Sequence, residues 1–178
     1  FYPANVMGSH VSDVPNHQTG NITPMKFRFD IACAGRLGME LQPKKMTDSE
    51  KAFAKRAIES YKEYRDIIMN GDLYRIGSPY DKSGAYGLMY VTPDKKKAVF
   101  FAYCISYDTR FSAPQLRLSG LSETADYRIT ELNVDKSASW FSGKVLPGSM
   151  LMNKGVNPPL KKVYDSAIFL LETAPSAQ

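Results

Sequence analysis

Both histidines of the chain lie in one short polar segment, Gly8 to Gly20, whose residue types could support chemistry. Its reactive side chains are Ser9, His10, Ser12, Asp13 and His17. Such residues could form a metal site, a serine nucleophile with its base, or a loop that hydrogen-bonds the hydroxyl groups of a substrate. The plainer interpretation is that the histidines only tie this loop together through hydrogen bonds.

The first two interpretations have weak support in the spacing. His10, Asp13 and His17 are legitimate zinc ligands, but their spacing matches no compact metal signature. Ser9 or Ser12 could pair with a histidine and Asp13, yet sequence neighbours rarely face each other correctly in a triad. The Gly-x-Ser-x-Gly elbow of many serine hydrolases is absent from the sequence. We therefore expect neither a metal site nor a serine nucleophile in this segment.

Acidic and aromatic residues raise the question of sugar chemistry. Glycoside hydrolysis needs two carboxyl groups about 5–10 Å apart across the sugar. Ahead of the first long helix the chain offers only Asp13, Asp30 and Glu40, and nothing in their spacing identifies an acid and a nucleophile. We expect Asp30 to face solvent or form a salt bridge. Trp140-Phe141 could stack on a sugar in a carbohydrate-binding domain, although such aromatics more often pack within a protein.

Composition and charge exclude several classes of protein. With 43% hydrophobic and 23% charged residues, the balance is that of a globular domain. The net charge of +5 is spread over the chain, whereas a nucleic-acid binder gathers its charge in a patch, so we expect no nucleic-acid partner. The apolar run from Ala98 to Ile105 is too short to span a membrane. Cys33 and Cys104 lie in apolar runs and should be free core thiols. The sequence does not indicate a compartment.

The segment before Gly71 has the pattern of an α/β unit. We predict short strands over Val6–Val11 and Lys26–Cys33, the second from its alternating polarity. Thr47 and Glu50 fit a capping box that starts a helix over residues 48–70, and Gly71 should end this helix in a left-handed conformation. One helical face is apolar and consists of Phe53, Ala57, Tyr61, Tyr64 and Ile68.

After Gly71 the pattern changes to short β-rich runs between turns. We predict strands at Leu73–Ile76, Tyr86–Val91, Ala98–Tyr107, Gln115–Leu118, Tyr127–Leu132, Met150–Met152 and Ile168–Thr173, with Lys95, Lys96 and Lys97 at a solvated hairpin tip. Many short strands of this kind indicate an antiparallel sandwich. The chain starts at Phe1 rather than Met, and we expect its first part to be the end of an α/β fold that begins elsewhere. The long helix should then pack on the β-domain or leave an exposed apolar patch.

Several motifs resemble one enzyme family. Met7-Gly8-Ser9-His10-Val11-Ser12 and Val14-Pro15-Asn16-His17-Gln18-Thr19 resemble the late-barrel signature of bacterial α-galactosidases of the melibiase type, in glycoside hydrolase family 36. The run from Ala32 to Leu41 is similar to the last barrel strand and its following loop. Tyr61-Lys62-x-x-Arg65 with Gly71-Asp72-Leu73-Tyr74-Arg75 resembles the end of the last barrel helix. Looser matches are Leu116-Arg117-Leu118-x-Gly120-Leu121 and Met150-x-Met152-Asn153-x-Gly155.

The resemblance implies a fold and a function. Residues 1–71 would end a (β/α)8 barrel, and residues 72–178 would form a C-terminal antiparallel β-sandwich. The family removes terminal α-linked galactose, as from melibiose or raffinose, with retention and without metal or cofactor. Its two catalytic aspartates lie on earlier barrel strands, and neither Asp13 nor Asp30 matches their motifs. The implied protein is therefore a C-terminal fragment, inactive alone, of a parent that is a homo-oligomer. His10 is its one substrate-binding candidate, and a non-catalytic carbohydrate-binding sandwich is the alternative.

Overall fold

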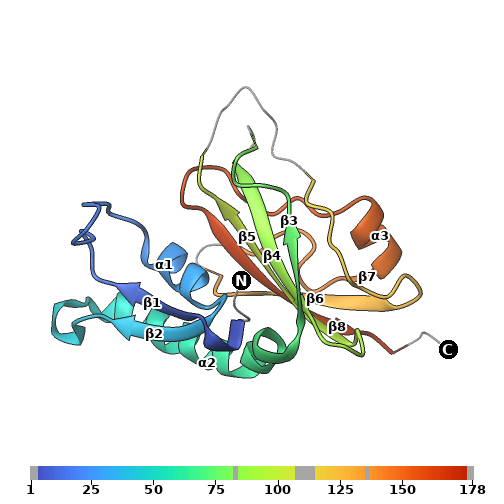
Figure 1. The fold of residues 1–178 in the computed structure, drawn as a ribbon, viewed down its shortest axis with the longest axis horizontal. Coiled ribbons are helices and arrows are strands. Elements are labelled where there is room, and N and C mark those ends of the chain that lie inside the picture. Colours follow the sequence, from blue (N-terminus) through green and yellow to red (C-terminus); the bar gives the residue numbers. More distant parts are fainter. Residues whose placement is uncertain (1–3, 82–83, 107–114, 135–136, 176–178) are drawn as a thin grey trace.

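The computed structural model describes residues 4–81, 84–106, 115–134 and 137–175 (Figure 1). The helical elements are η1 (Ala4–Val6), α1 (Met25–Ala32), η2 (Pro43–Lys45), α2 (Asp48–Asn70) and α3 (Gly148–Asn153). The strands are β1 (Gly8–Ser12), β2 (Arg36–Glu40), β3 (Asp72–Ile76), β4 (Ala85–Val91), β5 (Lys97–Cys104), β6 (Asp126–Leu132), β7 (Val145–Pro147) and β8 (Ser166–Thr173).

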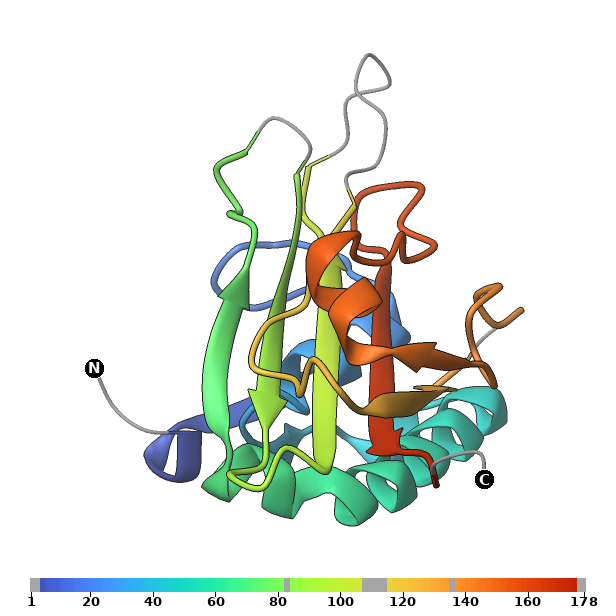
Figure 2. The ribbon, with the colours of Figure 1, turned by 90° about the vertical axis from the view of Figure 1, so that its right-hand side faces the viewer.

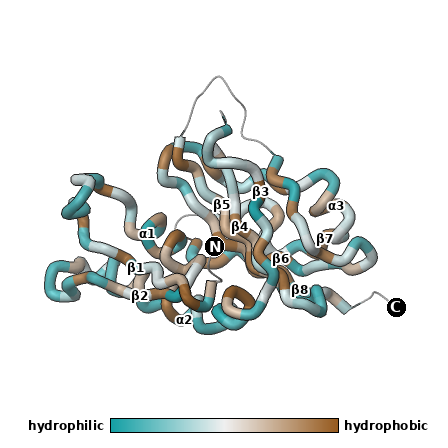
Figure 3. Tube along the Cα trace, in the orientation of Figure 1, coloured by the Kyte–Doolittle hydropathy of each residue, from teal (hydrophilic) through white to brown (hydrophobic). Residues whose placement is uncertain are grey.

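A six-stranded antiparallel sheet in the order β3-β4-β5-β8-β6-β7 forms the larger part of the molecule. Its central strands are buried on both faces, which explains why β5 reads as an unbroken apolar run. Phe100 and Phe169 point into a core shared with α3, whereas Phe101 and Ile168 point into a core shared with α2. Figure 3 shows this concentration of hydrophobic residues along the central strands, with hydrophilic residues in the outer loops.

The first part of the chain adds a two-stranded parallel sheet, β1-β2, and two helices. Helix α1 contacts β1 on one side and β8 on the other, and α2 packs on β4 and β5. Helix α1 therefore lies between the small parallel sheet and the large antiparallel sheet, and α2 runs along the bottom of the view (Figure 1). In Figure 2 the orange helix α3 lies in front of the large sheet, and the blue and teal elements lie behind and below it. The predicted mixed fold, a βα portion followed by antiparallel β-structure, is confirmed.

The long helix is confirmed with its cap and its buried face. The Thr47 hydroxyl accepts the Glu50 backbone N–H at 3.2 Å, and the Glu50 carboxylate accepts the Thr47 N–H at 2.9 Å. The five residues predicted for the apolar face are all buried. Tyr64 and Ile68 share a core with Phe101, so the helix packs on the antiparallel sheet, the first of the two predicted outcomes.

The predicted strand at Lys26–Cys33 is wrong, because these residues belong to helix α1. Short alternation misleads here because the helix is buried on two sides. Phe27 and Cys33 pack toward the large sheet, whereas Phe29 and Ala32 pack toward β1 and α2. A helix packed on both sides has no single apolar stripe, so its period is hidden over eight residues.

Three further local predictions need correction. Gly71 is extended (φ −88°, ψ 161°), and a side chain is excluded there because a Cβ would lie 2.4 Å from the Ile67 carbonyl oxygen. Residues 150–152 lie in helix α3 rather than in a strand. The prediction failed because a run of three residues with one buried side chain, Leu151, fits a strand and a single helical turn equally well. Within Gln115–Leu118 only Leu116 forms a β-bridge, with Val156. Tyr107 lies outside the described residues.

The expectations for the two cysteines and for the lysine run are met. Cys33 and Cys104 are free and buried, and burial raises the pKa of the Cys33 thiol to about 12. The three lysines at residues 95–97 are exposed at the β4–β5 hairpin. Among the described residues, no helix is both long and apolar enough to cross a membrane.

Candidate functional site

The parallel sheet has a polar face and an apolar face. Its register pairs His10 with Gly38 and Ser12 with Glu40, which places these side chains on the same face. Val11 points to the other face, where it is fully buried in a core with residues of α1 and α2. Because side chains alternate along a strand, the face with His10, Ser12 and Glu40 is turned away from the helices.

His10 contacts a carboxylate across this polar face. Its Nε2 atom lies 3.2 Å from Oε2 of Glu40, and the two side chains are 50% and 63% exposed. Gly38, the register partner of His10, places no side chain beside the imidazole. The pair is therefore open to a hydroxyl-bearing ligand. Glu40 is a site residue that sequence reasoning missed, because only the parallel register brings it next to His10.

The loop after β1 is tied together by an asparagine. The Asn16 side-chain oxygen accepts the backbone N–H groups of Gln18 and Thr19, both at 3.0 Å, and the Thr19 hydroxyl at 3.2 Å. His17 is exposed. His10 therefore links β1 to β2 rather than the loop, and within the loop it is Asn16 that makes the hydrogen bonds.

Arg28 on α1 holds the two ends of the same loop. Its Nη1 donates to the Ser12 carbonyl at 2.5 Å, and its Nε donates to the Thr23 carbonyl at 3.2 Å. Burial lowers the pKa of this half-buried guanidinium, and the carboxylates of Glu50 and Asp13 oppose that effect. Arg28 was also missed, because residues 26–33 were predicted as a strand and only helix α1 places its guanidinium between the two ends of the loop.

A small cleft of about 160 Å³ lies beneath this loop. Three of the predicted residues, His10, Ser12 and Asp13, line it together with Asn16 and Arg28. Neither Ser9 nor His17 is among the lining residues. The cleft is smaller than the roughly 300 Å³ of a small-molecule site, so these groups fit one part of a larger site.

The geometry gives no support to the other two chemical interpretations. Across the described ranges, no three His, Cys, Asp or Glu side chains gather in a way that could hold a metal ion. His10 is paired with Glu40 rather than with Asp13. Ser9 follows the opposite alternation to His10 along β1, so its hydroxyl points away from the imidazole.

Asp30 lies on the other side of α1, fully buried against the large sheet. Its carboxylate forms a salt bridge with Lys26 and accepts the Ser166 hydroxyl at 2.8 Å and the Asn133 side-chain amide at 3.1 Å. Burial raises the pKa of Asp30, and the nearby Lys26 ammonium opposes this shift. The predicted salt bridge is confirmed and the alternative, solvent exposure, is wrong. The Lys26–Asp30 spacing of four residues was the signal for a helix.

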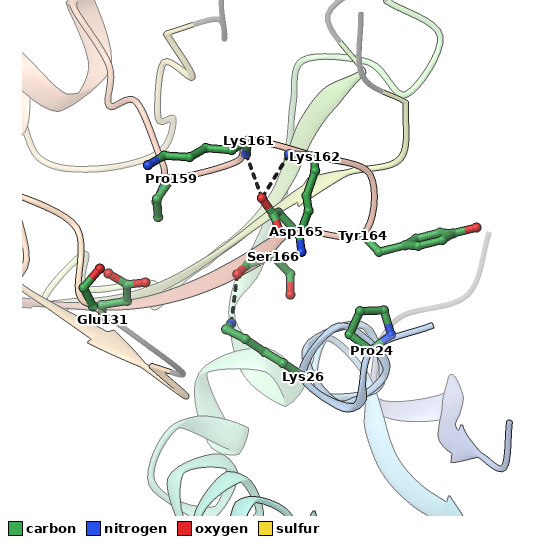
Figure 4. A pocket seen from close by; sticks show the side chains of 10 residues that line it. Pro24, Lys26, Glu131, Pro159, Lys161, Lys162, Tyr164, Asp165 and Ser166 are labelled. Carbon is green, nitrogen blue, oxygen red and sulfur yellow. Dashed lines mark hydrogen bonds between the residues drawn. The ribbon is translucent and has the colours of Figure 1, made fainter. Parts of the chain in front are cut away.

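Another cavity, of about 420 Å³, lies between α1 and the start of β8 (Figure 4). Lys26 and Ser166 line it, and Lys26 Nζ donates to the Ser166 carbonyl at 2.8 Å. Asp165, also in the wall, accepts the backbone N–H groups of Lys161 and Lys162 at 2.7 and 3.0 Å. None of the candidate site residues of the β1–α1 loop lines this cavity.

Trp140, between β6 and β7, is 60% exposed. The Lys144 ammonium lies 4.9 Å from the centroid of its ring, and the Phe141 ring meets it edge to face at 5.4 Å. Phe141 itself is buried. One exposed indole with a cation over its ring is a modest platform for a sugar.

Two family models match the chain. Residues 1–71 match Melibiase, and residues 85–171 match the glycosyl hydrolase family 36 C-terminal domain. Among curated relatives, the probable alpha-galactosidase G of Aspergillus terreus is 34% identical over 172 residues, covering 96% of this chain and 22% of the relative. The alpha-galactosidase AgaA of Geobacillus stearothermophilus is 36% identical over 133 residues, covering 75% of this chain and 18% of the relative.

Solved structures of AgaA variants share the fold. The complex with raffinose has a TM-score of 0.85 at 30% identity, and the complex with stachyose has 0.84 at 31%. Each comparison covers 97% of this chain and 23% of the solved chain. The chain thus spans about a fifth of the length of the relatives that it matches.

Proposed function

We propose, since the chain belongs to glycosyl hydrolase family 36, that it is the C-terminal portion of a retaining α-galactosidase that hydrolyses terminal α-galactosides such as melibiose or raffinose. The observation that carries this proposal is the joint match of the two family models, in order, over residues 1–71 and 85–171. AgaA, crystallised with raffinose and stachyose, supports the same class of substrate.

The proposed division places the end of a catalytic barrel in residues 1–71 and a C-terminal domain in residues 72–178. The parallel pairing of β1 with β2, backed by α1 and α2, is the arrangement of neighbouring strands and helices in a (β/α)8 barrel. The antiparallel sheet begins at β3, directly after Gly71. In this proposal the second domain is structural.

His10 is proposed as a residue on the substrate side of that barrel. The carboxyl ends of barrel strands and the loops that follow them form the catalytic face. His10 lies on β1, shortly before such a loop, on the polar face and in contact with Glu40. A histidine held by a carboxylate can donate or accept one hydrogen bond with a sugar hydroxyl.

Catalysis itself is assigned to carboxylates that this chain does not supply. A retaining glycosidase needs two carboxyl groups about 5–5.5 Å apart on opposite sides of the glycosidic bond. Asp30 is buried behind α1, and Glu40 is engaged by His10. The chain alone is therefore proposed to be inactive. The parent is proposed to be a homo-oligomer that needs no metal, cofactor, nucleic acid or membrane.

The decisive experiment compares hydrolysis of a chromogenic α-galactoside by this chain and by the same chain extended N-terminally to include a whole barrel. Cleavage by the long form alone is expected, with the matching β-galactoside as the control substrate. Cleavage by the short chain would refute its inactivity, and failure of the folded long form would refute the substrate class.

The exposure of Trp140 favours one second candidate, a carbohydrate-binding role for the C-terminal domain. Isothermal titration of this chain with galactosides tests it, with Trp140→Ala as the paired variant. Heat that is released with the unsubstituted chain and lost with Trp140→Ala would support sugar binding. Flat titrations would remove this candidate.

A further inference from the structure

We propose that Asp30 is a positioning residue, through which the antiparallel sheet fixes helix α1 and thereby the substrate-side loop of residues 13–24. This inference rests on the proposed function only for the role of the loop. The mechanical connection is argued from the contacts of one short helix that faces both parts of the molecule.

Asp30 joins α1 to the large sheet by three contacts. Ser166 on β8 donates its hydroxyl to the carboxylate, and Asn133, directly after β6, donates its side-chain amide. Tyr103 on β5 donates its hydroxyl to the backbone carbonyl of Asp30 at 3.0 Å. Strands β5 and β8 and the residue directly after β6 therefore all contact Asp30, and Lys26 balances its charge within the helix.

The carboxylate is well suited to fix a position. Asp30 is 0% exposed, so each of its hydrogen bonds replaces a bond that water would otherwise make. Apolar contacts alone would tolerate small sliding of the helix, whereas hydrogen bonds require particular distances and angles. Asp30 therefore sets where α1 lies on the sheet.

Arg28 transmits this position to the loop. It lies two residues before Asp30, and side chains two apart on a helix point in widely different directions. Its guanidinium holds the Ser12 carbonyl, where β1 ends, and the Thr23 carbonyl, just before α1. Both ends of the loop are thus attached to the helix that Asp30 anchors. His10 lies two residues before Ser12 on the same face of β1.

The test removes two of these three contacts from the sheet side and leaves Asp30, Lys26 and Arg28 in place. The variant Tyr103→Phe/Ser166→Ala deletes only two hydroxyl groups, so the core keeps its volume. Tyr127→Phe is the matched control, because its buried hydroxyl also donates to a backbone carbonyl, that of Lys95 at 2.7 Å, within the β-domain.

Hydrogen–deuterium exchange of the 178-residue chain gives a readout that needs no sugar. The loop amides of Gln18 and Thr19 are bonded to Asn16 and should exchange at least about fivefold faster in the double variant. Amides of α2 and of the β4–β5 hairpin should change no more than in Tyr127→Phe. In Ser166→Thr, which retains a hydroxyl, the loop amides should exchange at nearly the same rate as in the unsubstituted chain.

In the extended chain the same double variant should raise KM for the α-galactoside about fivefold and change kcat little, because the loop contacts substrate but not the reacting bond. The proposal would be overturned if exchange of the loop amides in the double variant were unchanged. It would also be overturned if exchange rose by the same factor throughout the chain, with no excess in the loop over Tyr127→Phe. An extended chain that cleaves no α-galactoside would refute the proposed function, while the exchange result would still decide whether Asp30 positions the loop.

Discussion

Replacement of Lys26 by methionine should lower the free energy of unfolding, because it leaves the buried carboxylate of Asp30 without its charge partner. Lys26 is the charge partner of Asp30, which is fully buried, and it also donates to the Ser166 carbonyl. Breaking a buried pair by removing one partner costs about 3–5 kcal/mol. Because Ser166 and Asn133 still donate to the carboxylate, we expect the lower end, about 3 kcal/mol at neutral pH. That corresponds to a fall in Tm of about 6–12 °C for a chain of this length.

The loss should depend on pH in a defined direction. Burial raises the pKa of Asp30 above its ordinary 3.8 in the folded state, so the folded protein holds this proton more tightly than the unfolded chain. The stability from this group is fully present below pH 3.8 and is lost as the pH rises through the folded pKa. Lys26→Met removes the opposing charge and raises the folded pKa further. The deficit of the variant should therefore shrink as the pH falls through the raised folded pKa of Asp30.

Urea denaturation followed by circular dichroism at several pH values measures this effect. Lys51→Met is the matched control, since Lys51 pairs with Asp48 at 3.3 Å on the exposed start of α2 and should contribute less than about 1 kcal/mol. The reasoning about Asp30 would be refuted if Lys26→Met lowered the free energy of unfolding no more than the control does. It would also be refuted if the decrease did not change with pH.

Three further predictions concern local features. Thr47→Ala should lower the free energy of unfolding by about 1 kcal/mol in urea denaturation, because it removes the helix cap; an unchanged midpoint would contradict this. Tyr64→Phe should leave the free energy of unfolding unchanged or raise it by up to about 1 kcal/mol, since among the described residues its buried hydroxyl has no hydrogen-bond partner. Tyr127→Phe should instead lower the free energy of unfolding by about 1 kcal/mol, because its hydroxyl donates to the Lys95 carbonyl. Cys33 and Cys104 should resist a thiol reagent at neutral pH until the chain unfolds, because burial raises the pKa of both thiols; rapid native labelling would contradict this.

The elements that could be predicted from the sequence are those with a local cause. Helix α2 has a capping box at its start and one apolar stripe, and both signals are physical requirements of an exposed helix start and a one-sided helix. The β4–β5 hairpin has a turn signal between two apolar runs. Helix α1 was not predicted as a helix because it is buried on two sides, so its apolar residues do not follow the helical period.

The candidate site was predictable only in part. His10 and its polar neighbours stand out by residue type, and the structure places His10, Ser12 and Asp13 around one cleft. Glu40 and Arg28 did not stand out, because their roles depend on the parallel register and on the orientation of α1. Such partners are set by tertiary structure, and no spacing within the chain encodes them.

The most direct test of the central claim is an NMR spectrum of the first product that the barrel-extended chain releases from melibiose. A retaining α-galactosidase releases α-galactose first, and the β-anomer appears only later by mutarotation. Initial release of α-galactose would establish the sugar, the linkage and the double displacement in one measurement. Initial release of β-galactose, or no galactose from a folded protein, would contradict the assignment.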